Sequence, residues 1–225
     1  MFGEAYKTKG GFFVMKKRLS VIVLLLMVLT ISALGKEVLL YEANFDNSDA
    51  RDVDWIPVYG EWDILGSQMV NFDLIHNNTN IYQELEQFGE GVFIYEYKFT
   101  PDNRSKDYAP CVGLHFMASD GEHAARGDSY LIFQDANELQ IYRSRKGNLG
   151  QAIVQVPGFG CALGQESIVR IEYHNTTGLI EVYVNGKKAA DWTDHNPIDE
   201  GYFISLRTNC TAASYDYVKV WFRDN

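Results

Sequence analysis

The sequence predicts an all-β fold, a sandwich of two antiparallel sheets. Short runs in which apolar and polar residues alternate follow one another from residue 37 to residue 222, and a period of two places alternate side chains on opposite faces of a half-buried strand. Turn residues separate the runs. Asn185-Gly186 suits a type I′ hairpin turn, because both residues reach positive φ at low cost. Helix-period patterning is almost absent after residue 35, so we expect no buried helix pair and no βαβ unit.

Alternation and turn residues place the strands in order along the chain. Residues 92–99 are typical, because Phe93, Tyr95 and Tyr97 fall on one face of the strand. An aromatic stripe with this spacing faces a core more often than a ligand. Many short strands with turns at short intervals favour a sandwich. The expected strands cover residues 37–44, 55–58, 61–64, 68–72, 81–85, 92–99, 111–118, 129–134, 138–143, 151–156, 168–174, 179–184, 187–192, 201–207 and 215–220.

Several short motifs follow one another in a familiar order. Residues 60–62 read Gly-Glu-Trp, residues 185–186 Asn-Gly, residues 191–194 Asp-Trp-Thr-Asp, residues 201–207 Gly-Tyr-x-x-x-Leu-Arg, and residues 215–220 Tyr-Asp-Tyr-Val-Lys-Val. This order resembles the concanavalin A-like, laminin-G-like jelly rolls, and within them the secreted bacterial modules found among polysaccharide-degrading systems. The resemblance runs from about Val38 to Phe222. It implies a two-sheet antiparallel jelly-roll sandwich and an association with polysaccharide.

The N-terminal region is typical of an export signal. A basic group at residues 16–18 precedes an apolar run at residues 19–34, and small residues stand near Gly35. We interpret residues 1–35 as a cleaved signal peptide, with a retained helical anchor as the alternative, although the apolar run is short for a bilayer span of about 20 residues. The expected mature protein is then one β-sandwich domain, residues 36–225, that is secreted or periplasmic and leaves the membrane once the signal is cleaved.

The charge of the chain limits its partners. The whole sequence has 30 acidic and 20 basic residues, a net charge of −10. Since residues 1–35 contain five basic residues and one acidic residue, the remainder has a net charge of −14. Such a surface repels nucleic acids and anionic membranes, so neither is expected as a partner. The three cysteines leave two possibilities open: one disulfide with one spare thiol, or three buried thiols.

The sequence lacks the common catalytic motifs. It contains no Gly-x-Ser-x-Gly motif, no His or Cys spacing typical of zinc, and no phosphate-binding glycine loop. Retaining glycosidases need two carboxylates about 5 Å apart, and laminarinase-like relatives of the fold carry them in a Glu-x-Asp-x-x-Glu motif. Residues 61–63, Glu-Trp-Asp, come nearest but lack the second glutamate. These absences favour binding over catalysis.

Sugar binding needs only aromatic rings and planar polar groups on one surface. Sugar rings stack on aromatic side chains, and their hydroxyls pair with amide, guanidinium and carboxylate groups. Arg207 is the strongest candidate, because it matches the arginine that ends the corresponding strand of the concave sheet in the resembled modules. The outward positions of the expected strands supply the full candidate set: His115, Tyr130, Gln140, Tyr142, Glu172, His174 and Arg207.

A structural calcium ion is a second implication of the resemblance. Jelly-roll sugar-binding modules often hold calcium between their first and last strands, and Glu42, Asp46 and Asp216 match those places approximately. Calcium prefers six to eight oxygen ligands, which carboxylates, backbone carbonyls and water can supply. An alternative is that Asp216 accepts a hydrogen bond at the edge of a strand.

The leading hypothesis is a secreted carbohydrate-binding module that recognises a poly- or oligosaccharide on a concave β-sheet face. One alternative is a glycoside hydrolase or polysaccharide lyase on the same fold, with active residues among His115, Glu172, His174 and Arg207. Another is a structural or adhesive envelope protein whose sheet face contacts another protein.

We expect translation to begin at Met15, because residues 15–18 read Met-Lys-Lys-Arg, an ordinary start of a signal peptide. Residues 9–11, Lys-Gly-Gly, can be encoded by a purine-rich string that resembles a bacterial ribosome-binding site. N-terminal sequencing of the unprocessed precursor should therefore find Met15 first. Any peptide from residues 2–9 would overturn this expectation.

Overall fold

The computed structural model describes residues 35–46, 54–123 and 125–224. Within them, Glu37–Asp224 form one compact unit. The expected start at Met15 and the expected signal peptide, up to residue 34, lie outside the described residues. No helix in the described part of the chain has the length and apolar character needed to cross a bilayer.

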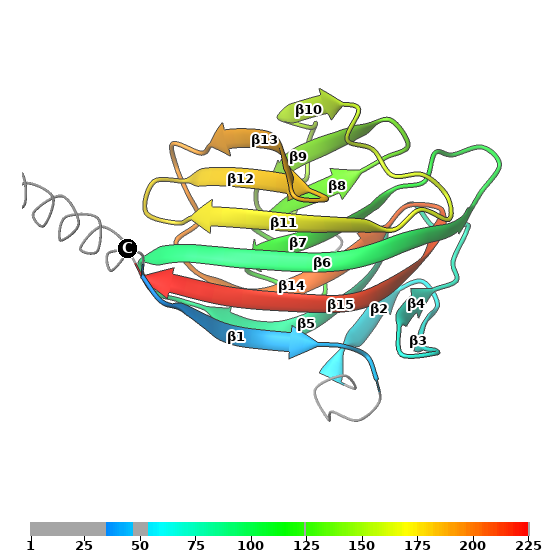
Figure 1. The fold of residues 1–225 in the computed structure, drawn as a ribbon, viewed down its shortest axis with the longest axis horizontal. Helices are drawn as coiled ribbons and strands as arrows, with labels where there is room; N and C mark the ends of the chain where they lie inside the picture. Colours follow the sequence, from blue (N-terminus) through cyan, green and yellow to red (C-terminus); the bar gives the residue numbers. More distant parts are fainter. Residues whose placement is uncertain (1–34, 47–53, 124, 225) are drawn as a thin grey trace, which may run out of the picture. The chain divides into compact units, whose positions relative to one another are not determined.

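The first layer is an eight-stranded antiparallel sheet (Figure 1). Its centre is the pair β6 and β15, which are joined along nearly their whole length. β1 also pairs with β15, so the first and last strands of the unit lie side by side. In order across the sheet the strands are β13 (Lys187–Thr193), β12 (Leu179–Val184), β11 (Ser167–His174), β6 (Gly91–Arg104), β15 (Thr211–Asp224), β4 (Met69–Asn71) and β3 (Trp62–Ile64), with β1 (Glu37–Ala43) off this path.

The second layer is a seven-stranded antiparallel sheet. Its order is β10 (Val154–Pro157), β9 (Glu138–Ser144), β8 (Ser129–Gln134), β7 (Val112–Ala118), β14 (Gly201–Thr208), β5 (Thr79–Gln87) and β2 (Ile56–Tyr59). Neighbours such as β7 and β14 are distant in sequence, so the chain crosses repeatedly between the sheets. The predicted all-β, two-sheet antiparallel sandwich is confirmed.

The predicted hairpin turn lies between β12 and β13. Asn185 and Gly186 both have positive φ, 50° and 76°, as a type I′ turn requires. The amide oxygen of Asn185 also accepts a hydrogen bond from the backbone of Ile168, with a nitrogen to oxygen distance of 2.9 Å. This turn therefore fixes the register of two strands and ties them to the start of a third.

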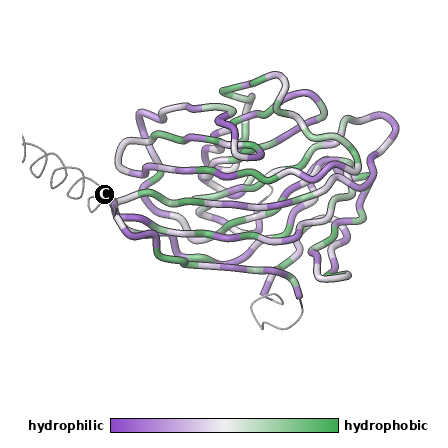
Figure 2. Tube along the Cα trace, viewed as in Figure 1, coloured by the Kyte–Doolittle hydropathy of each residue, from purple (hydrophilic) through white to green (hydrophobic). Residues whose placement is uncertain are grey.

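Aromatic side chains fill the space between the two sheets. Phe116 of β7 lies 4.7 Å from Tyr95 of β6 and 5.4 Å from Tyr130 of β8, measured between ring centroids. Tyr130 in turn lies 5.1 Å from Tyr173 of β11. Figure 2 shows hydrophobic and hydrophilic residues interspersed along the strands, as expected when each strand has one face in this core. The stripe that begins at Phe93 faces the core, as predicted.

A buried polar network joins the sheets at one end of this core. The carboxylate of Asp194, which follows β13, accepts hydrogen bonds from Tyr130 (2.9 Å) and from Nε of Arg143 (3.0 Å). Tyr130 was expected to point outward toward a ligand. This expectation was wrong, because Tyr130 has the parity of the inner face and its ring is fully buried among aromatic side chains.

Hydrogen bonds keep the carboxyl group of Asp194 ionised. Burial on its own would raise the pKa of this carboxyl group, but the backbone of Asn196, the hydroxyl of Tyr130 and the guanidinium of Arg143 lower it below the usual 3.8. The stabilisation is therefore present above the unfolded-state pKa and is lost as the pH falls through the folded-state pKa.

The three cysteines are free thiols in this structure, and no disulfide joins them. Cys161 and Cys210 are buried. Burial raises the pKa of the Cys161 thiol to about 12, so this side chain acts as a small apolar group.

The substitution Asp194→Asn should lower the free energy of unfolding at pH 7 by about 3–5 kcal/mol, because it leaves Arg143 buried without its counter-charge. Urea unfolding from pH 7 to pH 3 measures the effect. The difference from the natural protein should begin to shrink below the unfolded-state pKa of 3.8, where the unfolded chain binds the proton, and should go on shrinking as the pH falls toward the lower folded-state pKa. A difference that does not change with pH would contradict this assignment.

Candidate functional site

The strand registers bring chemically varied side chains together on the outer face of the seven-stranded sheet, the face turned away from the aromatic core. Two rows of residues cross this face, and each row has one residue from β5, β14, β7, β8 and β9. The first row is Asn80, Arg207, Gly113, Phe133 and Gln140, and the second is Tyr82, Ser205, His115, Leu131 and Tyr142. We call these ten residues the outer-face site.

Arg207 lies between Asn80 and Gly113 in the first row of the outer-face site. Gly113 is closely packed against β8, because a Cβ atom on it would lie 2.2 Å from the backbone oxygen of Ile132 and 2.6 Å from the ring of Phe133. The guanidinium of Arg207 extends toward Phe133, 5.8 Å from the ring centroid. Its Nη1 lies 3.4 Å from Nε2 of His115. Arg207 is 9% exposed, so only the edge of its side chain reaches solvent.

Burial changes the acid-base behaviour of this pair. It lowers the pKa of Arg207 to about 10, which still leaves the guanidinium charged at neutral pH. Burial, together with the positive charges of Arg207 and Arg126, lowers the pKa of His115 well below 6.5. His115 is therefore neutral at pH 7, and because it is fully buried it supports Arg207 rather than contacting a ligand.

Arg126 adjoins the outer-face site and was not among the residues predicted for it from the sequence. Residues 119–128 form a loop between β7 and β8, and Arg126 reaches from it to the sheet, where its Nε donates to Oγ of Ser205 (3.0 Å). Its Nη1 donates to the backbone oxygens of Gly121 and His123. The side chain is fully buried, and burial lowers its pKa to about 10. A polar loop on a sheet was the available signal, but which of its residues faces the sheet depends on the loop conformation.

Gln140 and Tyr142 form the more open side of the outer-face site. The hydroxyl of Tyr142 donates to Oε1 of Gln140 (2.7 Å), and Nε2 of Gln140 donates to the carboxylate of Glu138 (2.7 Å). Both side chains are half-buried. The structure therefore brings four of the predicted ligand-binding residues onto one face: His115, Gln140, Tyr142 and Arg207.

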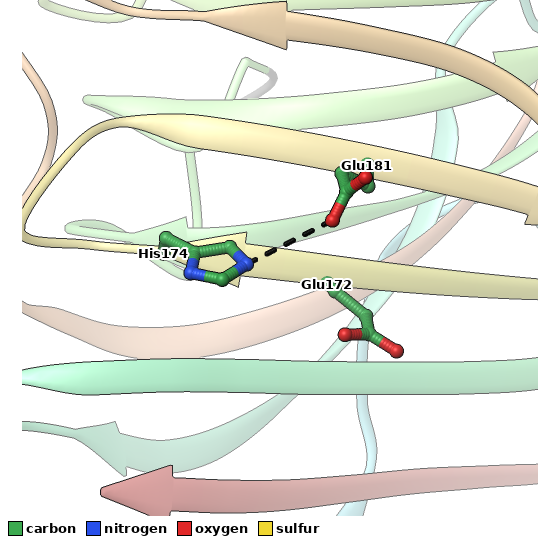
Figure 3. Close-up of side chains that lie close together, drawn as sticks. All are labelled: Glu172, His174 and Glu181. Atoms are coloured by element: carbon green, nitrogen blue, oxygen red, sulfur yellow. Dashed lines mark ion pairs between the residues drawn. The ribbon is translucent and has the colours of Figure 1, made fainter. Parts of the chain in front are cut away.

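Glu172 and His174 lie elsewhere, on the outer face of the eight-stranded sheet, so their expected place beside Arg207 was wrong. Glu172 accepts from Nε of Arg170 (3.0 Å) and pairs with Arg223 (3.2 Å). His174 lies 3.8 Å from the carboxylate of Glu181 on β12, as the dashed line in Figure 3 shows. Period-two alternation assigned both residues to an outer face correctly, but it could not tell which sheet β11 joins.

Glu172, His174 and Glu181 also form the one group of potential metal ligands found among the described residues. Their candidate ligand atoms lie within 4.8 Å of one another (Figure 3). Lysine and arginine compete for these carboxylates, since Nζ of Lys188 lies 2.7 Å from Glu181 and Arg170 and Arg223 hold Glu172. The arrangement is first of all an ion-pair network.

The residues expected to bind calcium have other partners. The carboxylate of Glu42 lies 2.7 Å from Nζ of Lys219. Asp216 accepts a hydrogen bond from Gln68 (2.7 Å) and pairs with Lys98 (3.4 Å). Asp46 is exposed at the end of the first described segment. Calcium binding at these residues stays a prediction.

A separate cavity of about 610 Å³ opens among loops at one end of the unit. Phe88 is 43% exposed beside it and stacks edge-on against Tyr202, with 5.2 Å between ring centroids. The cavity wall is otherwise short loops and exposed carboxylates. Its lining residues are Phe88, Gly89, Glu90, Asn175, Thr176, Pro197, Asp199 and Glu200.

Replacing Arg126 with methionine should lower the free energy of unfolding by about 2–4 kcal/mol, because backbone oxygens of the loop lose a buried donor. Urea unfolding measures the change. Arg145→Met is the matched control, since Arg145 is 56% exposed and its pairing with Asp194 spans 3.7 Å. This control should cost no more than about 1 kcal/mol. Equal losses in the two variants would contradict the role given to Arg126.

No family model and no curated protein sequence matches the chain, but solved structures do. The carbohydrate-binding module CBM66 from Bacillus subtilis aligns with a TM-score of 0.60 and 16% identity, over 72% of this chain and 92% of its own. The carbohydrate recognition domain of Emp47p aligns with a TM-score of 0.62 and 12% identity, over 84% and 98%. A Bacillus licheniformis beta-glucanase gives 0.58 and 14%, over 82% and 98%. The chain therefore has the predicted concanavalin A-like jelly-roll fold, while its laminin-G-like character stays a prediction.

Proposed function

We propose that the protein binds a poly- or oligosaccharide on the outer-face site. The observation that carries this proposal is the position of Arg207, a charged guanidinium on a sheet face that also carries Gln140 and Tyr142 on β9. The names of similar structures support it, since they include a carbohydrate-binding module and carbohydrate recognition domains. At these low identities, the binding function of this chain rests on its own residues.

Arg207, Gln140 and Tyr142 can each contribute a distinct contact to a sugar. The guanidinium of Arg207 offers donors to sugar hydroxyl or ring oxygens, and the amide of Gln140 both donates and accepts. The half-buried ring of Tyr142 offers an apolar surface against which a sugar ring can stack. Phe133 is only 4% exposed, so it supports Arg207 from the side and makes little contact with a ligand.

Secretion and calcium binding belong to this proposal as separate expectations. We infer export to the periplasm or the medium from the sequence pattern of residues 1–35. We place any structural calcium at Glu42, Asp46 and Asp216. Among similar structures, the Emp46p carbohydrate recognition domain occurs in potassium-bound and metal-free forms. Glu42 and Asp216 lie on β1 and β15 of the eight-stranded sheet, so the outer-face site does not include them.

Arg207→Ala should weaken binding to a polysaccharide by about 10- to 100-fold, because it removes a charged donor from the site. Titration calorimetry against a panel of soluble polysaccharides measures the affinity, and thermal melting verifies the fold. Arg170→Ala is the matched control, since Arg170 projects from the outer face of the other sheet. That variant should keep the full affinity.

The same titrations separate binding from turnover and from a structural role. New reducing or unsaturated ends on the polysaccharide would show that the protein is an enzyme on the same fold. Failure to bind any glycan would favour the structural or adhesive alternative. Adding EDTA should leave the affinity unchanged, since the expected calcium ligands belong to the other sheet. Equal losses in Arg207→Ala and Arg170→Ala would show that the outer-face site is not the place of binding.

A further inference from the structure

Two buried guanidinium groups on the seven-stranded sheet lack an acidic partner. Among the described residues, neither Arg207 nor Arg126 forms an ion pair with a carboxylate; their side chains contact His115, Ser205 and backbone oxygens instead. Arg143, which is similarly buried in the core, lies 3.0 Å from the carboxylate of Asp194. Buried charges are normally paired, because removing an ion from water costs several kcal/mol.

Individual polar atoms at the same place also lack partners within the described part of the chain. Nε of Arg207 and Nη2 of Arg126 are buried donors without a hydrogen-bond acceptor, and Oδ1 of Asn80 is a buried acceptor without a donor. Asn80 is the direct neighbour of Arg207 on β5. An unsatisfied buried polar group costs about 1–3 kcal/mol. Groups that carry this cost in a folded protein are often those that a ligand satisfies.

The nearest carboxylates are engaged elsewhere. Asp120 accepts hydrogen bonds from the backbone of Glu122 (2.8 Å) and His123 (2.9 Å) in its own loop. Glu138 accepts from the side chain of Gln140 (2.7 Å), as described above. His115 is neutral at pH 7 and adds no charge. Asp120 attracts the charge of Arg126 without forming an ion pair with it, so the described residues leave the two guanidinium groups without an ion-paired carboxylate, although the protein as a whole has a net charge of −10.

We propose that the sugar bound on the outer-face site carries a carboxylate, as uronic acid units do, and that Arg207 pairs with that carboxylate. This inference rests on the binding function proposed above and names the class of ligand. The planar guanidinium matches a carboxylate with two parallel hydrogen bonds, which a neutral hydroxyl cannot provide. Gln140 and Tyr142 lie on β9 of the same face, with β7 and β8 between β9 and Arg207 on β14, so they can contact other parts of the same oligosaccharide.

Arg126 strengthens this preference without contacting the ligand. Its side chain is fully buried, so it acts only through its positive charge. That charge also helps to keep His115 neutral, which leaves the imidazole free to accept a hydrogen bond from Nη1 of Arg207. The acidic remainder of the protein surface repels anionic chains.

The test uses oligosaccharides that differ only in charge. Trimers of galacturonic, glucuronic and mannuronic acid are titrated into the purified protein by calorimetry at pH 7, each beside its methyl ester, which keeps the sugar ring but removes the negative charge. The natural protein should bind at least one free acid about tenfold or more tightly than the matching ester, since an unpaired buried charge is costly. Arg207→Gln should bind the acid and the ester equally.

Arg207→Lys is the second variant, because it keeps the positive charge but loses the planar fork. It should retain part of the preference for the acid. Thermal melting verifies that both variants fold, and the comparison of acid with ester in the natural protein needs no variant. Equal affinity for acid and ester, or a preference that survives in Arg207→Gln, would overturn this inference.

The proposed function and this inference fail in different ways. The protein could bind neutral polysaccharide through Arg207 and show no higher affinity for any acidic sugar. That result would leave the carbohydrate-binding function intact and overturn the proposed ligand class. Absence of binding to every acidic and neutral glycan would overturn both.

Discussion

The packing of the two inner sheet faces is the constraint on which the rest of the structure depends. Because side chains alternate along a strand, every residue that enters the aromatic layer fixes its neighbours on an outer face. Leu114 and Phe116 of β7 lie in the core, and His115 between them must face outward. Likewise Leu206 of β14 is in the core and places Arg207 on the outer face. The composition of the outer-face site is thus a consequence of core packing.

Much of the fold could be predicted from local patterns. Alternation located the strands, and the conformational preferences of Asn185 and Gly186 predicted their turn, because both signals depend on neighbouring residues only. The assignment of strands to sheets could not be predicted in the same way, since pairs such as β6 and β15 are brought together by the whole topology. Glu172 and His174 show the result, because they lie on the opposite sheet from Arg207. The expectation for Tyr130 was wrong for another reason: residues 129–134 carry apolar side chains on both faces, so alternation does not show which face is buried.

The site itself was only partly predictable, for a related reason. Arg207, His115, Gln140 and Tyr142 lie on regular strands, where parity determines the direction of a side chain. Arg126 lies in a loop, where direction depends on backbone angles such as its own positive φ of 61°. Gly113 looked like an ordinary strand residue, yet β8 packs so closely against it that a Cβ atom would lie 2.2 Å from the backbone oxygen of Ile132. Such effects need three-dimensional neighbours, which periodicity does not supply.

The central claim is that ligands bind on the outer face of the seven-stranded sheet, and backbone chemical-shift mapping by NMR tests it most directly. The protein, labelled with nitrogen-15, is titrated with an oligosaccharide that it binds. The account predicts that the largest shifts occur in β7, β8, β9 and β14, around Arg207, with small shifts in β11 and β12. Shifts that centre on Glu172 and His174, or on the cavity beside Phe88, would contradict it.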